Sequence, residues 1–465
     1  MLFSSITFLF YFLPACVLLY FLVPTKLKNT VLLLFSLFFY AWGGVKYAVL
    51  MLAAITIGYV SGLLIELFRG KWLAKFFLAL GVATIISFML YFKYTDFFIE
   101  NINAALGTSI PLLKLALPIG ISFFTFQTIS YVVDVYRGEK AQKNPINLAA
   151  YVAMFPQLIA GPIVRYADVA RELNHRTHSF VEAGEGLRRF IIGLAKKVLI
   201  ANSMYDLSQI VYNSEEKSVV FFWMYGIAVG LYIYFDFSGY SDMAIGLGKV
   251  FGFHFLENFN YPYISKSATE FWRRWHMSLG SWFRDYVYIP LGGNRVPKWR
   301  WFINIFAVWL FTGFWHGASW NFILWGLFFG VLLVIEKFWL LKYLEKSHVI
   351  SRIYILFAAM ISFMVFNIDG LGEAFSYVGG LFGAGDIPFI NGTTIYYLRS
   401  YAVLLIAAIV GATPVVKNMA IKLSTSEKTS KVMSFVEPVF LVGLLVVVTA
   451  FLVDSSSNPF LYFRF

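Results

Sequence analysis

The sequence predicts an all-α, polytopic membrane protein. Of its 465 residues 60% are hydrophobic and 13% are charged, whereas a soluble domain of this length carries about a quarter charged residues. Backbone at membrane depth satisfies its own hydrogen bonds as helix, so we expect roughly ten to twelve transmembrane or re-entrant helices. The clearest apolar runs are Leu2–Val23, Val45–Leu67, Leu73–Phe92, Phe221–Phe237, Ala318–Phe338, Ile353–Phe366 and Val436–Val453.

The charge balance also fits a membrane protein. The net charge is +12, from 37 Lys+Arg against 25 Asp+Glu, a surplus that in a soluble protein would suggest a nucleic-acid partner. Here the basic residues gather in short loops between apolar runs, as in Arg69–Lys75 and Arg137–Lys143, which is the positive-inside pattern. We therefore expect a lipid bilayer and no nucleic acid as partner. Lys26 and Lys28, after the first run, predict an extracytoplasmic N-terminus.

The sequence gives no sign of a metal site. The single cysteine, Cys16, excludes an internal disulfide and a cysteine-rich metal cluster. No HExxH-type spacing is present. His175 and His178 lie three residues apart in a polar loop beside Arg176, and we interpret that loop as solvated. We expect neither a bound metal nor a tightly bound cofactor.

The sequence predicts a single integral-membrane domain, residues 1–465, made of three segments. Residues 1–110 predict N-terminal spans and residues 321–465 predict C-terminal spans. Between them, residues 111–320 carry Pro118 and Gly120, then Pro156, Gly161 and Pro162, inside otherwise apolar sequence. Such breaks are tolerated where backbone is buried in protein or lines a cavity. The middle segment is therefore the predicted catalytic core.

Two histidines in this core are the strongest candidates for chemistry. His276 and His316 lie about forty residues apart in an otherwise apolar chain. An ionisable side chain at membrane depth usually faces a polar cavity or a partner, and histidine suits proton transfer near neutral pH. A hydrogen-bonded core histidine is the competing interpretation, and it is stronger for His276 than for His316. We predict both as catalytic residues.

The first histidine lies in an aromatic and basic segment. A continuous helix over Glu270–Arg284 would place three tryptophans on one face: Trp272, Trp275 and Trp282. Glu270 would pair with Arg274 one turn later. The arginines could hold a phosphate or pantetheine-type donor, or they could anchor the helix at the membrane surface with the tryptophans. The candidate substrate-binding residues here are Trp272, Trp275, Arg273 and Arg274.

Two carboxylates, Asp236 and Asp242, lie in an apolar neighbourhood. Transport proteins place acids in this way to bind ions or protons. The alternative, which we favour, is that they cap a broken helix and pair with arginines. Ser238 and Gly239 predict the start of a new helix between them. Both aspartates are retained as candidate substrate-binding residues.

The second histidine lies between glycines and aromatic residues. Gly313 and Gly317 form a small-xxx-small pair that permits close helix contact. Packing accounts for the glycines but not for His316 itself. A neutral imidazole in a tunnel is a good general base for a hydroxyl, and this is the functional interpretation of His316. Trp315 and Asn321 are the candidate substrate-binding neighbours, and Asn321 is a candidate donor to an oxyanion.

Taken together, these motifs make the chain resemble the membrane-bound O-acyltransferase (MBOAT) family, in its alginate O-acetyltransferase (AlgI-like) branch. The motifs that carry the resemblance are Met1–Ser5, Phe10–Pro14, Ser36–Trp42, Leu117–Gln127, Phe155–Pro162, Asp236–Met243, Phe271–His276, Pro290–Arg295, Trp315–Gly317 and Asn458–Phe465. The resemblance implies a ring of helices around a central funnel, with His316 catalytic and His276 in the family's second histidine position. Asn367 departs from the branch, where an arginine is expected.

The resemblance also implies a reaction and its setting. An acyl group, acetyl in this branch, would move from a cytoplasmic thioester, acetyl-CoA or an acyl carrier, to a hydroxyl acceptor. Extracytoplasmic transfer proteins and a polysaccharide would complete the pathway, at a bacterial cytoplasmic (inner) membrane. The alternatives are D-alanyl transfer from a carrier protein (DltB-like), a transporter or flippase of an acylated intermediate, and a structural scaffold. No two related halves, typical of many transporters, are visible in the sequence, and a scaffold leaves His316 unexplained.

Overall fold

The computed structural model describes residues 1–454 and 458–461. Residues 455–457 and 462–465, including part of the C-terminal motif, lie outside the described residues. Within the described residues every regular element is helical, which confirms the all-α prediction. The chain forms two compact units that interleave in sequence. The single-domain organisation in three segments stays a prediction.

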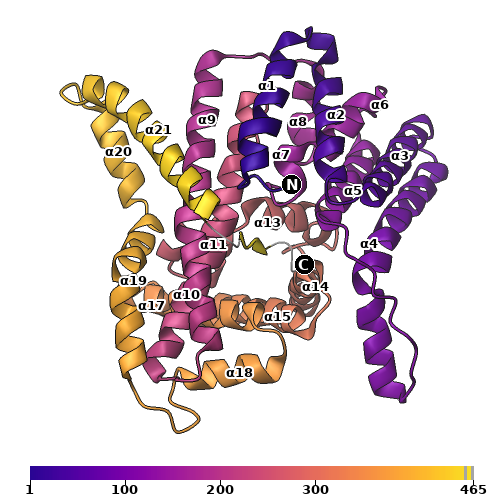
Figure 1. Ribbon diagram of the computed structural model, residues 1–465. Helices are drawn as coiled ribbons and strands as arrows, with labels where there is room; N and C mark the ends of the chain where they lie inside the picture. Colours follow the sequence, from indigo (N-terminus) through magenta and orange to yellow (C-terminus); the bar gives the residue numbers. More distant parts are fainter. Residues whose placement is uncertain (455–457, 462–465) are drawn as a thin grey trace. The chain divides into compact units, whose positions relative to one another are not determined.

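The first unit comprises Met1–Phe190 and Ser241–Leu256. Its helices (Figure 1) are η1 (Phe8–Phe12), α1 (Leu13–Leu22), η2 (Thr25–Leu27), α2 (Lys28–Ala41), α3 (Val45–Leu67), α4 (Trp72–Leu106), α5 (Ile121–Arg137), α6 (Pro145–Ala153), α7 (Phe155–Leu158), α8 (Tyr166–Asn174) and most of α9 (Phe180–Ala195). Helix α3 packs against both α4 and α5. The predicted break before α5 is confirmed, because Gly120 adopts the left-handed region (φ 76°) and the helix begins at Ile121.

The second unit comprises Ile191–Tyr240 and Glu257–Leu461. Its elements are η3 (Lys196–Ala201), α10 (Asn202–Asn213), much of α11 (Val219–Val250), η4 (Pro262–Ile264), α12 (Ala268–Arg274), α13 (Met277–Phe283), η5 (Arg284–Tyr288), α14 (Lys298–His316), α15 (Trp320–Ile335), η6 (Glu336–Leu340), α16 (Leu341–Leu344), α17 (His348–Asn367), α18 (Leu371–Gly380), α19 (Gly392–Gly411), α20 (Val415–Thr425) and α21 (Ser430–Asp454). This unit contains both candidate histidines.

Helices α14 and α15 form a closely packed pair that carries His316 (Figure 1). A Cβ atom at Gly313 would lie 2.3 Å from the carbonyl oxygen of Phe322, and one at Gly326 would lie 2.3 Å from the carbonyl oxygen of Trp309. Only glycine permits this backbone approach. The predicted role of Gly313 in close helix contact is therefore confirmed.

Helix α11 does not follow the prediction made for its polar segment. It runs unbroken from Val219 to Val250, so the prediction that Ser238 and Gly239 start a new helix is wrong. The glycine serves packing instead, since a Cβ atom there would lie 2.7 Å from the carbonyl oxygen of Gly193. Close helix contact, rather than a helix start, accounts for the small residue.

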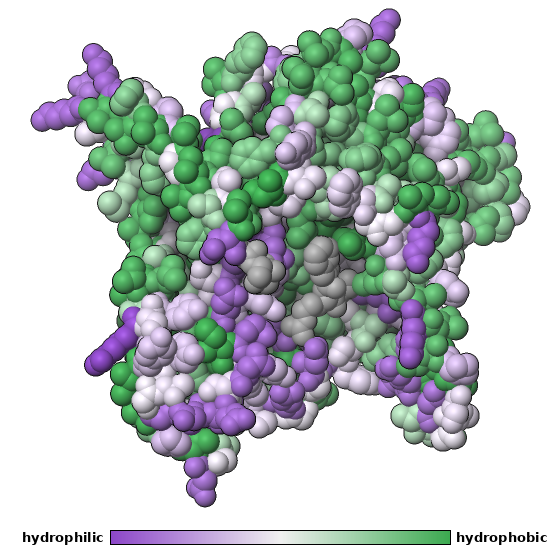
Figure 2. Space-filling model, in the orientation of Figure 1, coloured by the Kyte–Doolittle hydropathy of each residue, from purple (hydrophilic) through white to green (hydrophobic). Residues whose placement is uncertain are grey.

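Seven helices in the described part of the chain are long and apolar enough to cross a membrane. They are Val45–Leu67, Trp72–Leu106, Val219–Val250, Trp320–Leu344, His348–Asn367, Gly392–Gly411 and Ser430–Asp454. Only 6% of the apolar window in α21 is buried inside the protein, which suits a helix in contact with lipid. Apolar side chains also cover much of the face in Figure 2. The count of ten to twelve and the ring stay predictions.

Candidate active site

His276 lies at a break between two short helices. Helix α12 ends at Arg274 and α13 begins at Met277, while His276 adopts the left-handed region with φ 45° and ψ 51°. The prediction of one continuous helix over Glu270–Arg284 is therefore wrong, and the tryptophans do not share a single helical face. A left-handed residue other than glycine is strained and is often found at functional sites.

Asn258 holds this break in place. Its backbone oxygen accepts a hydrogen bond from the Met277 N–H (3.0 Å), and its side-chain Oδ1 accepts from the N–H (3.3 Å) and hydroxyl (2.8 Å) of Ser278. The same Oδ1 lies 3.1 Å from Nδ1 of His276. Sequence reasoning missed Asn258, whose only signal was a polar residue among aromatic ones.

These contacts determine the tautomer of His276. Because Oδ1 of Asn258 accepts a backbone N–H, it is an oxygen and not a flipped amide nitrogen. The neutral imidazole nitrogen that faces it must therefore carry the proton. Nε2 then carries the lone pair, and this atom is buried without a hydrogen-bond partner among the described residues.

His276 is neutral in this environment. Its side chain lies in the linker between α12 and α13, is 1% exposed, and contacts the edge of Phe237 at 4.6 Å between ring centroids. Burial lowers the pKa of His276 to about 3, since desolvation disfavours the charged form. At neutral pH, Nε2 can accept a hydrogen bond or a proton.

His316 is the last residue of α14, and it lies close to His276. It is 7% exposed and packs between Trp325 (5.0 Å between ring centroids) and Phe366 (5.3 Å). The Trp315 ring contacts both histidines, at 4.9 Å from His316 and 5.9 Å from His276. The structure thus places the two predicted histidines around one tryptophan.

Three indole rings form a continuous tryptophan cluster that reaches His316 through Trp325: Trp272, Trp309 and Trp325. Trp325 contacts Trp272 at 5.5 Å, and Trp272 contacts Trp309 at 4.7 Å between ring centroids. Of the predicted substrate-binding tryptophans, Trp315 therefore contacts both histidines, and Trp272 lies one ring further away, against Trp325.

Trp275 and the arginines of α12 have other surroundings. Trp275 is buried among aromatic core residues, with ring centroids 4.9 Å from Phe363 and 5.5 Å from Phe271. Arg274 forms the predicted pair with Glu270 (2.9 Å) and also donates to a backbone carbonyl. Arg273 is exposed, which makes it the more accessible cation for a donor phosphate.

A buried glutamate fixes the start of α12. Glu336 is 1% exposed and its carboxylate accepts from the Ala268 N–H, from the Thr269 N–H (2.9 Å) and from the Thr269 hydroxyl (2.7 Å). These donors belong to the first turn of α12, where a carboxylate satisfies unpaired N–H groups and the helix dipole. Sequence reasoning missed Glu336, although an acidic residue inside the apolar run Ala318–Phe338 was a visible signal.

Asn321 caps a neighbouring helix. Its amide donates to the carbonyl oxygens of Val365 (3.1 Å) and Ile368 (2.7 Å) at the end of α17. Both amide hydrogens are engaged within the protein, which leaves none for an oxyanion. Asn367, at the position where the resemblance led us to expect arginine, donates to the Tyr225 hydroxyl (3.1 Å).

Both candidate aspartates are ion-paired. Asp242 pairs with Arg189 (2.8 Å), as the structural interpretation predicted. Asp236 pairs with Lys197 (2.6 Å), so the prediction of an arginine partner is wrong there. The Asp236 carboxylate also accepts from the Leu461 N–H (3.0 Å). These contacts favour structural roles for both residues.

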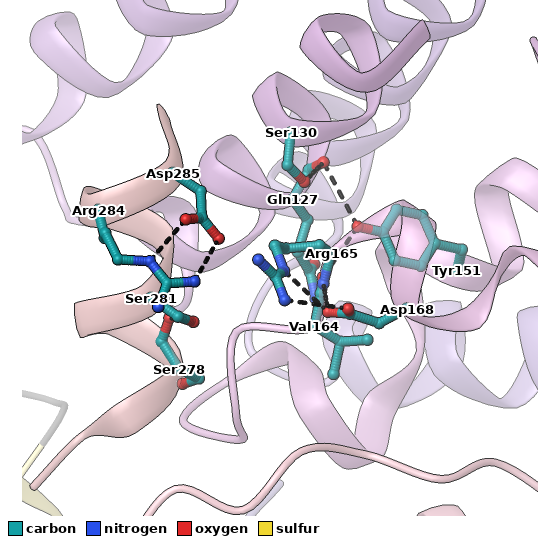
Figure 3. Close-up of polar contacts among 10 residues, drawn as sticks. All are labelled: Gln127, Ser130, Tyr151, Val164, Arg165, Asp168, Ser278, Ser281, Arg284 and Asp285. Carbon is teal, nitrogen blue, oxygen red and sulfur yellow. Dashed lines mark hydrogen bonds and ion pairs between the residues drawn. The ribbon is translucent and has the colours of Figure 1, made fainter. Parts of the chain in front are cut away.

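Polar side chains also hold the backbone within each unit, as Figure 3 shows. In the first unit the Tyr151 hydroxyl donates to the Val164 carbonyl (2.9 Å), and Asp168 pairs with Arg165 (3.0 Å) at the start of α8. In the second unit the Ser281 hydroxyl donates to the Ser278 carbonyl (2.9 Å) within α13. These contacts stabilise α8, which follows the predicted break at Pro156–Pro162, and α13, which follows the unpredicted break at His276.

The sequence profile of the membrane-bound O-acyltransferase family matches residues 83–368. The chain belongs to this family. A probable alginate O-acetylase AlgI of Azotobacter vinelandii is 41% identical over 83% of this chain and 79% of the relative. One of Pseudomonas putida is 37% identical over the whole of both chains. A peptidoglycan O-acetyltransferase of Helicobacter pylori is 32% identical over 100% of this chain and 98% of the relative. This MBOAT protein is therefore an O-acyltransferase and a multi-pass membrane protein.

Proposed function

We propose that this protein transfers an acetyl group from a thioester donor to a hydroxyl acceptor, as a step in O-acetylation of an extracytoplasmic polysaccharide. The names of the relatives support acetyl as the group and a polysaccharide or peptidoglycan as the final acceptor. The observation that carries the proposal is the pair of buried histidines around Trp315. The proposed site is the bacterial cytoplasmic membrane.

In the proposed reaction His316 acts as general base. It takes the proton from the acceptor hydroxyl as the hydroxyl oxygen bonds to the thioester carbonyl carbon. The tetrahedral intermediate then collapses, the carbon–sulfur bond breaks, and the departing sulfur receives the proton from His316. A positioned base of this kind contributes about 10²–10⁴-fold to rate.

His276 has a different task, because its tautomer is fixed. With Nδ1 donating to Asn258, only the Nε2 lone pair is available to the substrates. It accepts a hydrogen bond from a hydroxyl or amide N–H and so orients that group beside His316. Orientation at the reacting centre contributes to rate separately from proton transfer.

The donor and partners follow from the same chemistry. Acetyl-CoA or an acyl-carrier thioester would approach from the cytoplasm, with the exposed Arg273 available to its phosphate. The donor is consumed as a substrate, and no tightly bound cofactor is needed. An extracytoplasmic transfer protein would pass the acetyl group to the polysaccharide.

The test is acyl transfer in proteoliposomes with radiolabelled acetyl-CoA. We expect His316→Ala and His276→Ala each to lower label transfer about 10²–10⁴-fold, while His348→Ala, at an exposed position on α17, keeps the wild-type rate. Wild-type turnover by correctly inserted His316→Ala would refute the mechanism. Turnover of a D-alanyl carrier thioester without any response to acetyl-CoA would replace acetyl transfer by D-alanyl transfer.

A further inference from the structure

Acyl transfer needs hydrogen-bond donors as well as a base. Negative charge develops on the carbonyl oxygen in the transition state, and preorganised donors aimed at that oxygen contribute strongly to rate. Asn321 has both amide hydrogens engaged. His276 presents only a lone pair at Nε2. Neither residue can therefore supply these donors, and other groups beside His316 are needed.

Two indole groups have unused donors: Trp325, which contacts His316, and Trp272, which contacts Trp325. The Nε1 atoms of Trp325 and Trp272 are buried, and neither has an acceptor within the described residues. An indole N–H can only donate, and a buried donor without an acceptor is destabilising. Such a group in a native structure calls for an explanation.

Other indoles in the same unit do have acceptors. The Trp223 N–H donates to the Leu381 carbonyl (3.0 Å). The Trp301 N–H reaches both the Tyr288 hydroxyl (3.0 Å) and Asn294 Oδ1 (3.0 Å). Other indole donors thus have partners, while those of Trp325 and Trp272 have no acceptor in the part of the chain that the structure describes.

The two donors are held on well-anchored helices. Trp325 is 2% exposed and meets His316 edge to face, at 5.0 Å and 84°. Its helix α15 packs tightly on α14 at Gly326. Trp272 lies 5.5 Å from Trp325, on the helix whose first turn Glu336 holds. Donors that need no rearrangement are the ones that stabilise developing charge most effectively.

We propose that the indole N–H groups of Trp325 and Trp272 bind the carbonyl oxygen of the acyl group and stabilise the oxyanion. This inference rests on the proposed acyl transfer. As the hydroxyl oxygen bonds to the carbonyl carbon, the carbonyl π pair moves to oxygen and the two N–H groups strengthen their hydrogen bonds. When the carbon–sulfur bond breaks, the pair returns, and both indoles keep their protons throughout.

The test removes the N–H while keeping the ring. Benzothienylalanine, in which sulfur replaces the indole N–H, is introduced at position 325 or 272, with Trp325→Phe as a second variant. The matched control is benzothienylalanine at position 223, where the indole already has an internal partner. We expect kcat for acetyl transfer to fall about 10²-fold at position 325 and less at 272. KM should change little, and the control should keep wild-type kcat.

A direct readout accompanies the kinetics. The protein is labelled with ¹⁵N-tryptophan, and the indole N–H resonances are recorded by NMR. The ligand is a ketone analogue of acetyl-CoA, in which the carbonyl carbon is not bonded to sulfur and no acyl transfer can occur. It should shift the resonances of Trp325 and Trp272, and not that of Trp223. Wild-type kcat with benzothienylalanine at both positions, or unshifted resonances at saturating analogue, would overturn the inference while leaving acyl transfer intact. If the wild type transfers no acyl group from any thioester, the proposed function fails, and the resonances still decide whether the indoles bind a carbonyl.

Discussion

The second unit buries two polar clusters that differ in how completely they are satisfied. In the first, Lys197 contacts Asp236 (2.6 Å), the Asn202 amide oxygen (2.9 Å) and the Pro459 carbonyl. The other carboxylate oxygen of Asp236 accepts from the Leu461 N–H. In the second, His276 has a partner at Nδ1. Within the described residues its Nε2 has no partner, and the indole N–H groups of Trp325 and Trp272 have no acceptor.

The difference indicates what each cluster does. A completed buried network orders the fold, because every charge has a fixed partner; here it joins η3, α11 and the C-terminal segment. An incomplete network is costly and is retained where a substrate completes it. Satisfied groups should therefore affect stability when mutated, and unsatisfied groups should affect rate.

Among the atoms that lack a partner in the second cluster, the largest rate effect is expected at His276. Asparagine tolerates the left-handed backbone at this position, so His276→Asn should keep the fold while it removes the imidazole lone pair. We expect kcat to fall about 10²–10⁴-fold with thermal unfolding in detergent close to wild type. Should kcat stay at the wild-type value, the second cluster is structural after all and the comparison fails.

The largest stability effect is expected at Lys197 and Asp236. Removing one partner leaves a buried charge uncompensated, so Lys197→Met or Asp236→Leu should each cost about 3–5 kcal/mol of unfolding free energy. The double variant should recover most of that loss, because both charges are gone. Chemical unfolding in detergent measures the free energies.

The double variant also separates structure from chemistry. If it is stable yet its kcat falls as far as that of His276→Asn, Asp236 takes part in the reaction, as the sequence-based alternative held. If it keeps kcat within about tenfold of wild type, the carboxylate is structural.

The sequence predicted those features of the structure that depend only on residues close together in the chain. The apolar run Val45–Leu67 is helix α3 with the same bounds, since length and composition alone decide a membrane helix. The two histidines could likewise be selected as candidates, because an ionisable group in apolar sequence requires a reason, and their catalytic roles stay predictions. Both conclusions needed only neighbouring residues.

What the sequence did not predict depends on contacts between distant residues. The tryptophan spacing favoured one helix through His276, but Asn258 holds the break through hydrogen bonds to Met277 and Ser278. Asn321 resembled an oxyanion donor until its carbonyl partners on α17 were known. Local pattern cannot show which donors the fold consumes and which it leaves available.

A smaller rate effect should follow from changing the partner of His276. In Asn258→Asp a carboxylate would face Nδ1–H and raise the pKa of His276, which burial holds at about 3 in the wild type. Protonated Nε2 cannot accept a hydrogen bond. The rate should therefore fall as pH falls through the raised pKa, at a higher pH than in wild type.

The profile of kcat/KM against pH from about 5 to 9 measures this shift. Asn258→Leu serves as the control, since it removes the orienting oxygen without adding charge. It should lose about 10–100-fold in rate at every pH. An Asn258→Asp profile that matches the wild-type profile would show that His276 does not act through Nε2.

The smallest effect is expected at His254 in the first unit, a satisfied histidine that is 52% exposed. Its Nδ1 lies 2.7 Å from Glu172 and its Nε2 lies 3.4 Å from Glu182. The hydrogen bond to Glu172 raises the pKa of His254 above its usual value near 6.5. A raised folded-state pKa gives a stabilisation that is complete below the unfolded pKa and is lost as pH rises through the folded one.

Thermal unfolding of wild type and His254→Gln in detergent tests that sign. The wild type should be the more stable protein at about pH 5.5, and the difference should shrink by about pH 8.5. Exposure to solvent keeps the effect small. Acetyl transfer should be unchanged, because every polar atom of this imidazole already has a partner within the protein. A difference in stability that grows with pH would mean that the glutamates do not hold His254 protonated, and a loss of kcat would break the rule that satisfied groups affect stability alone.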